Sequence, residues 1–232
     1  MSITGQSLFV LLTLILFGLT VGLSSLVQLL LFPLIISAVV SLLLGLLVIP
    51  YLRRLKASQI IQEDGPQSHL KKAGTPTMGG IFFVPVALLV SLAFSHFNSD
   101  VLAVCLVSLG YMAIGWYDDW VILRKRSNKG ISAKTKLFLQ ILVATLFIVY
   151  LYLSKNSSLE QITNVNLPGK IILPLGALFW PLAGFAMTAE SNATNLTDGV
   201  DGLAGGTGAI AFIGLGLIIL PNQPNLAIFC AC

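Results

Sequence analysis

Residues 34–52 read LIISAVVSLLLGLLVIPYL, an apolar run that carries no charge and stops at Arg53 and Arg54. An α-helix needs about 17–25 apolar residues to cross the hydrocarbon core of a bilayer. Further uncharged runs follow at 73–99, 101–117, 137–154, 171–189 and 202–232. The chain therefore has the pattern of a polytopic membrane protein. We expect an all-α fold, a polytopic transmembrane helical bundle.

The composition of the 232 residues agrees with this class, because 56% are apolar and only 9% are charged. Soluble domains carry about 25% charged residues. The composition excludes a soluble globular enzyme, a disordered chain and a disulfide-stapled secreted module. The net charge of +4 is too small to indicate nucleic acid as a partner. The three cysteines lie in apolar runs, where we expect them to act as small packing residues.

The apolar runs predict about six to seven membrane spans in a single domain over residues 1–232. A run at 8–31 is long enough to span, but its glycines and serines weaken the pattern. Residues 226–232 have the pattern of a further span that has only begun, so we expect a domain that is incomplete at the C-terminus. The six clearest spans are expected near 34–52, 81–97, 101–117, 137–153, 171–189 and 205–220.

Basic residues predict the orientation of these spans. Eleven of the thirteen Lys and Arg residues lie in 53–72 and 124–136, and short loops rich in Lys and Arg stay in the cytoplasm. Counting spans from these two loops places 190–204 in the cytoplasm and 154–170 outside. Every stretch with chemically useful side chains then lies on the cytoplasmic side.

Asp118 and Asp119 directly follow an apolar run, and carboxylates close to a membrane interior are costly and mark functional sites. A polar stop at a helix end is the alternative interpretation. If the helix continues through this pair, the two side chains point about 100° apart. They would then have different roles rather than share one proton.

A second polar cluster, NATNLTDGVDGL at 192–203, places Asn195, Asp198 and Asp201 at a spacing of i, i+3, i+6. A helix would align these side chains along one face. A loop rich in Gly, Asn and Asp between two spans is the alternative. Carboxylates at this density suit Mg²⁺, which proteins hold through one or two carboxylates together with phosphate.

A third stretch, KKAGTPTMGG at 71–80, combines lysines, hydroxyls and glycine N–H groups before a span. Such groups bind phosphate, although a basic stretch beside a membrane also contacts anionic lipid. It lacks the G-x-x-x-x-G-K-[ST] spacing of a P-loop.

Together, DGPQSHLKKAGTPTMGG at 64–80, the Asp pair and NATNLTDGVDGLA at 192–204 resemble the MraY family of phospho-N-acetylmuramoyl-pentapeptide transferases. This family belongs to the polyprenyl-phosphate N-acetylhexosamine-1-phosphate transferases, which have ten helices and a cytoplasmic active site. The resemblance implies transfer of phospho-MurNAc-pentapeptide from UDP-MurNAc-pentapeptide to undecaprenyl phosphate, giving lipid I and UMP for peptidoglycan synthesis. It also implies a bacterial plasma membrane location, with the lipid bilayer as a partner and a homodimer as one assembly that we consider.

The residues that match the family's motifs divide into two groups. Asp118, Asp119, Asp198 and Asp201 are expected to be catalytic, and Asp198 and Asp201 to bind Mg²⁺. Substrate binding is expected of Lys72, Thr77, Lys136, Asn192 and Asn195. Asp118 would deprotonate or orient the lipid phosphate with help from Asp119, and the alternative of a phospho-enzyme stays open.

This chain departs from the family at Ile122, where a lysine is common and where Arg124 or Lys125 could substitute. The family's later motifs, which include a further metal-binding Asp and a histidine-rich loop, do not occur in residues 1–232. We therefore expect these residues alone not to catalyse transfer. The alternative functions are a polyprenyl-phosphate GlcNAc-1-phosphate transferase and, from a different class, a membrane transporter. Transporters place acids near the midplane and show repeated halves, and neither feature occurs here.

Overall fold

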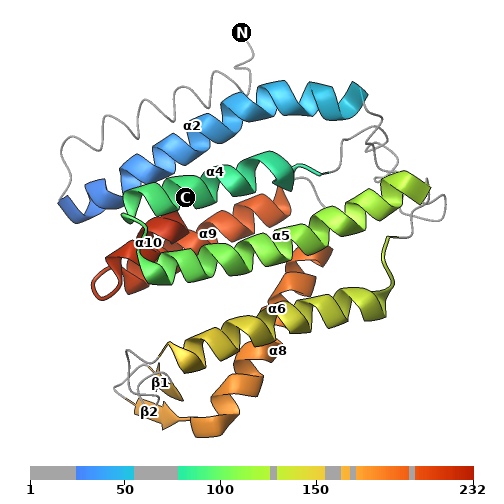
Figure 1. Ribbon diagram of the computed structural model, residues 1–232. Coiled ribbons are helices and arrows are strands. Elements are labelled where there is room, and N and C mark those ends of the chain that lie inside the picture. The colour runs from blue at the N-terminus through green and yellow to red at the C-terminus, as the bar shows by residue number, and fades with distance from the viewer. Residues whose placement is uncertain (1–24, 55–77, 126–129, 155–162, 168–170, 199–201) are drawn as a thin grey trace. The chain divides into compact units, whose positions relative to one another are not determined.

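The computed structural model describes residues 25–54, 78–125, 130–154, 163–167, 171–198 and 202–232. These residues form seven α-helices, a single-turn 3-10 helix and two strands (Figure 1). The all-α prediction is confirmed, with one small β-hairpin added to it. The helices are α2 (Ser25–Arg54), α4 (Gly80–Phe94), α5 (Ser99–Lys125), α6 (Ala133–Leu153), α8 (Phe179–Thr197), α9 (Leu203–Ile219) and α10 (Pro224–Ala231).

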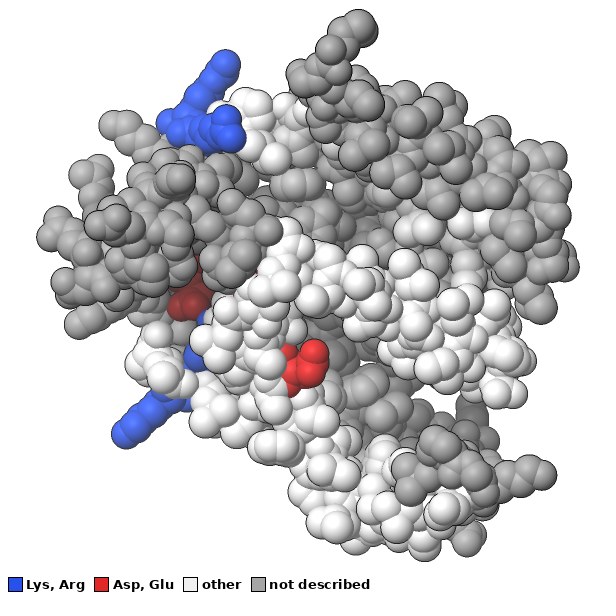
Figure 2. All heavy atoms as spheres, turned by 180° about the vertical axis from the view of Figure 1, so that it is seen from behind, with Lys and Arg blue, Asp and Glu red and all other residues white. Residues whose placement is uncertain are grey.

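Three segments within the described residues are long and apolar enough to cross a membrane: Gln28–Arg54, Ser99–Lys125 and Ala133–Leu153. The predicted spans near 81–97 and 205–220 correspond to the shorter apolar helices α4 and α9. Figure 2 shows one face on which Lys, Arg, Asp and Glu occupy only a few small areas of the described surface. Exposed Leu47, Leu106 and Leu146 suit helices that face lipid. The chain is a membrane protein.

Contacts divide the chain into two compact units, residues 1–109 with 207–232, and residues 110–206. In the first unit α2 packs on α4, and α10 packs on both. Leu88, Val101 and Cys105 form a buried core between α4 and the start of α5. The Cys105 sulfur lies 3.6 Å from the Ser91 hydroxyl. The three cysteines are free, in agreement with the predicted packing role.

The second unit contains the end of α5, all of α6 and α8, and the hairpin β1 (Asn164–Leu167) and β2 (Ile171–Pro174). The strands pair antiparallel, with Val165 opposite Leu173. α6 packs on α8, and Figure 1 shows the hairpin beside the ends of α6 and α8 that it connects. Four of the predicted site residues within the described part of the chain lie toward the other ends of these two helices: Lys136, Asn192, Asn195 and Asp198.

The prediction of a span over 171–189 is wrong at its beginning, because residues 171–174 form β2 and α8 starts only at Phe179. A short apolar run fits a buried strand as well as a helix, and hydropathy alone did not separate the two. Ile171 and Ile172 are β-branched residues that favour strands, and Pro174 ends the strand.

Of the two alternatives for residues 192–203, the helix holds as far as Thr197, because α8 continues to this residue and ends with Asp198 as its C-cap. The helix α5 likewise continues past the Asp pair to Lys125. Because the helix continues through both residues, the side chains of Asp118 and Asp119 point about 100° apart. This is the geometry that predicts separate roles for them. At the other end of α5, Asn98 caps the helix, because its side-chain oxygen accepts from the Asp100 and Val101 N–H groups.

Candidate active site

The Lys136 ammonium group is the centre of the candidate site. Its Nζ donates to Asp118 Oδ2 over 3.1 Å and to Asn195 Oδ1 over 2.8 Å. The three side chains come from α5, α6 and α8, all within the second unit. Lys136 therefore joins the Asp pair to the Asn-rich motif, although Asp118 and Asn195 are far apart in the sequence.

The Asp118 carboxylate is held through both of its oxygens. Oδ2 accepts from Lys136, and Oδ1 accepts from the backbone N–H of Ile131 over 2.9 Å. The Asp118 and Lys136 side chains are each 21% exposed, so the ion pair is largely shielded but reachable from solvent. Gly130 lies against the carboxylate, and a Cβ at that position would collide with it. The absence of a side chain on Gly130 is therefore required for this approach.

The start of α6 is built so that Lys136 lies one turn into the helix. Ser132 is the N-cap, and its hydroxyl accepts from the Thr135 N–H over 3.1 Å. Such a cap satisfies one of the free N–H groups of the first turn. The cap and the bond from Ile131 to Asp118 together place the first turn of α6 beside the end of α5.

Asp119 is half-buried in α5 and lies next to Asp118. Adjacent residues of a helix point about 100° apart, so the two carboxylates leave the helix in different directions. The prediction of separate roles agrees with this geometry, and the catalytic roles themselves stay predictions.

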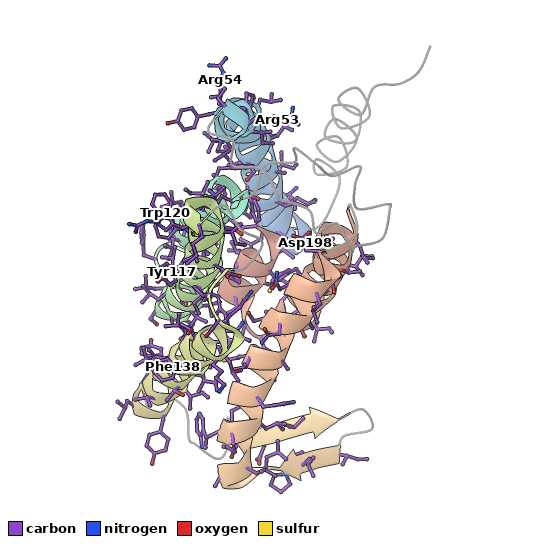
Figure 3. All side chains as sticks on the ribbon, turned by 90° about the vertical axis from the view of Figure 1, so that its right-hand side faces the viewer. Arg53, Arg54, Tyr117, Trp120, Phe138 and Asp198 are labelled. Atoms are coloured by element: carbon purple, nitrogen blue, oxygen red, sulfur yellow. The ribbon has the colours of Figure 1, made fainter. Side chains whose placement is uncertain are left out.

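Asn195 and Asp198 lie at the end of α8, three residues apart, and both are exposed. Figure 3 shows Asp198 at the C-terminal end of this helix. The predicted helical alignment holds for this pair. Asp201, Lys72 and Thr77 lie outside the described residues, so their predicted roles are not examined by the structure.

Asn192 lies one turn earlier in α8 and faces α6. Its Nδ2 donates to Gln140 Oε1 over 2.9 Å and to the Thr188 carbonyl over 2.8 Å. The side chain predicted to bind substrate is thus engaged between two helices. Its role toward substrate stays a prediction.

A hollow of about 580 Å³ lies between the end of α5 and the start of α6. Trp120, which stacks on Trp116, lines it together with Gly130 and Ile131 beside Asp118. Figure 3 shows Tyr117 and Trp120 on α5. The two cations proposed as substitutes for the family lysine, Arg124 and Lys125, both line this hollow.

No group of three or more His, Cys, Asp or Glu side chains that could hold a metal occurs among the described residues. Asp198 is nevertheless a suitable ligand for Mg²⁺, because it offers exposed carboxylate oxygens at the C-terminus of α8. That end of a helix carries partial negative charge and favours a cation. The donor chemistry fits the ion, and its second predicted ligand, Asp201, lies outside the described residues.

Gln140 is not among the residues predicted from the sequence, although its side chain is buried at 1% exposure and bonds to Asn192 and Ser191. A polar residue inside the apolar run at 137–154 was the available signal, because polar groups within a membrane are costly and tend to have a function. The backbone of Ile131 and the close approach of Gly130 gave no signal in the sequence.

Comparison with known families gives two matches. Residues 101–232 match the model of glycosyl transferase family 4, which is more than half of the chain. Residues 72–84 match the first signature of the phospho-N-acetylmuramoyl-pentapeptide-transferases. The resemblance noted in the sequence is confirmed.

Curated relatives cover nearly all of the chain. A phospho-N-acetylmuramoyl-pentapeptide-transferase of Rippkaea orientalis is 57% identical over 235 residues, which is 99% of this chain and 64% of the relative. Proteins of the same name from Microcystis aeruginosa and Gloeothece citriformis are 58% and 56% identical, again over 99% of this chain and over 63% and 64% of their own length. The chain thus spans slightly less than two thirds of the length of these relatives.

Proposed function

This chain belongs to glycosyl transferase family 4, and on that premise we propose that it carries the site of a phospho-N-acetylmuramoyl-pentapeptide transferase. The reaction takes UDP-MurNAc-pentapeptide and undecaprenyl phosphate to lipid I and UMP. A phosphate oxygen of the lipid forms a bond to the sugar-bearing phosphorus of the nucleotide. The bond between that phosphorus and the bridging oxygen breaks, and UMP leaves with the electron pair.

The observation that carries this proposal is the bridge from Asp118 through Lys136 to Asn195. Phosphoryl transfer between two anions depends on positioning and on neutralisation of charge more than on covalent help. A lysine ammonium has three N–H donors, and two of those of Lys136 are used within the described residues. The third donor supports a role in binding a phosphate oxygen next to Asp118.

Asp118 is the group that we assign to the acceptor phosphate. Its carboxylate is held by Ile131 and Lys136, so it has a defined direction before substrate arrives. A carboxylate fixed in this way orients the attacking phosphate or accepts its proton. Asp119 assists from its separate direction, and Lys72 and Thr77 contact the phosphates of the nucleotide.

We assign Mg²⁺ to Asp198 and Asp201, on the fit described for Asp198. A bound Mg²⁺ supplies positive charge that stabilises a pyrophosphate and its leaving group. Asp198 and Asp201 hold the ion, and Asn195, one turn before Asp198, ties this end of α8 to Lys136.

The orientation that we propose is multi-pass in the bacterial inner membrane, with the site on the cytoplasmic side. Asp118 of α5 and Asn195 at the end of α8 meet at Lys136 in the first turn of α6, whereas the hairpin lies at the opposite ends of α6 and α8. This supports the prediction that 118–136 and 190–204 share one side and that 154–170 lies on the other.

The test uses the chain joined to the unmatched remainder of the Rippkaea relative, called the completed chain below. Purified in detergent with Mg²⁺, it should release UMP from UDP-MurNAc-pentapeptide only when undecaprenyl phosphate is present. Transfer from UDP-GlcNAc in its place would favour the GlcNAc-1-phosphate transferase. No transfer from either nucleotide, in a preparation where the Rippkaea relative is active, would refute the proposal.

A further inference from the structure

Two layers of side chains connect the same three helices, and the active-site bridge is only the first of them. Asp118, Lys136 and Asn195 form this first layer. The second layer lies one or two helical turns away. It contains Tyr111 of α5, Gln140 of α6 and Asn192 of α8.

The spacing of the two layers follows from helix geometry. Gln140 lies four residues after Lys136, and Asn192 lies three residues before Asn195, so each pair shares a helix face. Tyr111 lies seven residues before Asp118, which is two turns and again the same face. Each member of the first layer therefore has a companion in the second layer on its own helix.

The second layer is closed by reciprocal bonds between two amides. Gln140 Oε1 accepts from Asn192 Nδ2 over 2.9 Å, and Gln140 Nε2 donates to Asn192 Oδ1 over 3.4 Å and to the Ser191 hydroxyl over 3.1 Å. The Tyr111 hydroxyl donates to the Gln140 carbonyl over 3.3 Å. Gln140 thus connects α6 to α8 through its side chain and to α5 through its backbone.

These bonds specify one register between α6 and α8. Gln140 is buried at 1% exposure, and a buried amide that loses its partners is costly because no water replaces them. A shift of α8 by one residue turns its side chains by about 100° and moves them by about 1.5 Å. Such a shift would break the amide pair, so this register is preferred. A buried polar residue that sets helix register has precedent in coiled coils.

We infer that Gln140 is a positioning residue, whose amide pair with Asn192 fixes the register of α8 on α6 so that Asn195 and Asp118 both reach the Lys136 ammonium. Within the described residues, the hydrogen bonds of the Gln140 amide go to Asn192 and Ser191, neither of which belongs to the first layer. Its effect on catalysis rests on the proposed function, whereas the amide pair itself does not.

The first test compares two variants of the completed chain. Gln140→Met keeps the length of the side chain and removes the amide, and Ile148→Ala loosens the same two helices near Gly184 without touching either layer. At equal concentrations of folded protein, Gln140→Met should lower kcat about tenfold and leave KM for the nucleotide nearly unchanged. Ile148→Ala should retain most of kcat. Equal kcat losses in the two variants would overturn the inference.

The second test asks whether Gln140 acts through Asn195. If it does, Gln140→Met should lower kcat much less in an Asn195→Ala background than in the parent, because the bond that it positions is already absent. Pairs that act in one network show this non-additivity. If Gln140→Met lowers kcat by the same factor in both backgrounds, Gln140 does not act through the first layer.

A third measurement needs no catalysis. Thermal melting of Gln140→Met, Asn192→Leu and the double variant should show that the two Tm losses are not additive. If the Tm losses are not additive but the chain transfers nothing, the inference about the amide pair stands and only the proposed function is refuted. Additive Tm losses would refute the amide pair, even in an active enzyme.

Discussion

Lys136 is the residue on which the geometry of the site depends, because its ammonium bonds to side chains of two other helices. The sequence predicts a role for Lys136 in substrate binding. The structure adds that it holds Asp118, whose second oxygen is held by Ile131. An ion pair at this depth contributes more through the direction that it gives the two side chains than through net stability, since burying charges costs about as much as their attraction returns.

The first prediction concerns Asp118. The change Asp118→Asn in the completed chain keeps the shape of the side chain and removes the charge that pairs with Lys136. We expect kcat for UMP release to fall by well over a factor of about ten, with binding of the nucleotide substrate retained. Steady-state kinetics and a separate nucleotide-binding measurement check this. Retention of more than about a tenth of kcat, about 1.4 kcal/mol of barrier, would remove Asp118 from its assigned role.

The second prediction concerns Asp198 and the metal. The change Asp198→Ala should raise the Mg²⁺ concentration for half-maximal activity about tenfold or more, because Mg²⁺ binds through few protein ligands and each one contributes strongly. Titration of activity with Mg²⁺ measures this. Asp100→Ala, in the first turn of α5, is the matched control and should leave the titration unchanged. Full activity of the parent in excess chelator would end the metal hypothesis.

At the scale of elements, the connection from α5 to α6 decides where Asp118 lies. The helix α5 runs past the Asp pair to Lys125, and α6 begins after the Ser132 cap. Between them, Gly130 and Ile131 pass directly against the Asp118 carboxylate. The hollow lined by Trp120 and Arg124 lies at the same place, because Gly130 and Ile131 also line it.

The third prediction tests this connection. In Gly130→Ala the new methyl group collides with the Asp118 carboxylate. The carboxylate must then move away from the Ile131 N–H and the Lys136 ammonium that hold it. We expect kcat to fall about tenfold or more while the protein stays folded. Gly115→Ala on α5 is the control, because nothing lies within 4 Å of its added Cβ. Equal activity of the two variants, measured as UMP release, would show that the close approach of Gly130 is unimportant.

At the scale of the whole molecule, the second unit brings the three side chains of the bridge together at one end of α6 and α8. The bridge joins the start of α6 to the end of α8, and the hairpin follows at the opposite ends of these helices. Because α6 is long and apolar enough to cross a membrane, the two ends should lie on opposite sides of the bilayer.

The fourth prediction is therefore topological. In a chain without native cysteines, Asn128→Cys and Thr194→Cys should resist a membrane-impermeant maleimide added to intact cells, and Ser157→Cys should react. After the membrane is permeabilised, all three should be labelled. Labelling at 128 or 194 in intact cells would contradict the cytoplasmic assignment.

The sequence by itself determined the membrane class, the helical fold, the family and the two motifs that meet in the site. Hydropathy and motif spacing are local properties of the chain, so they can be read without knowing which helices are neighbours. The partition of residues 171–178 between strand and helix already required the structure, because Ile171–Pro174 become a strand only by pairing with Asn164–Leu167.

Only the tertiary structure decided which side chains meet. That Lys136 pairs with Asp118 depends on which faces of α5 and α6 are adjacent, and this is set by packing between helices rather than by either helix alone. The same holds for Gln140, whose apolar neighbours in the sequence gave no sign of its amide partner on α8. The amide of Gln140 is satisfied by side chains of α8, so the sequence of α6 alone cannot identify its partners.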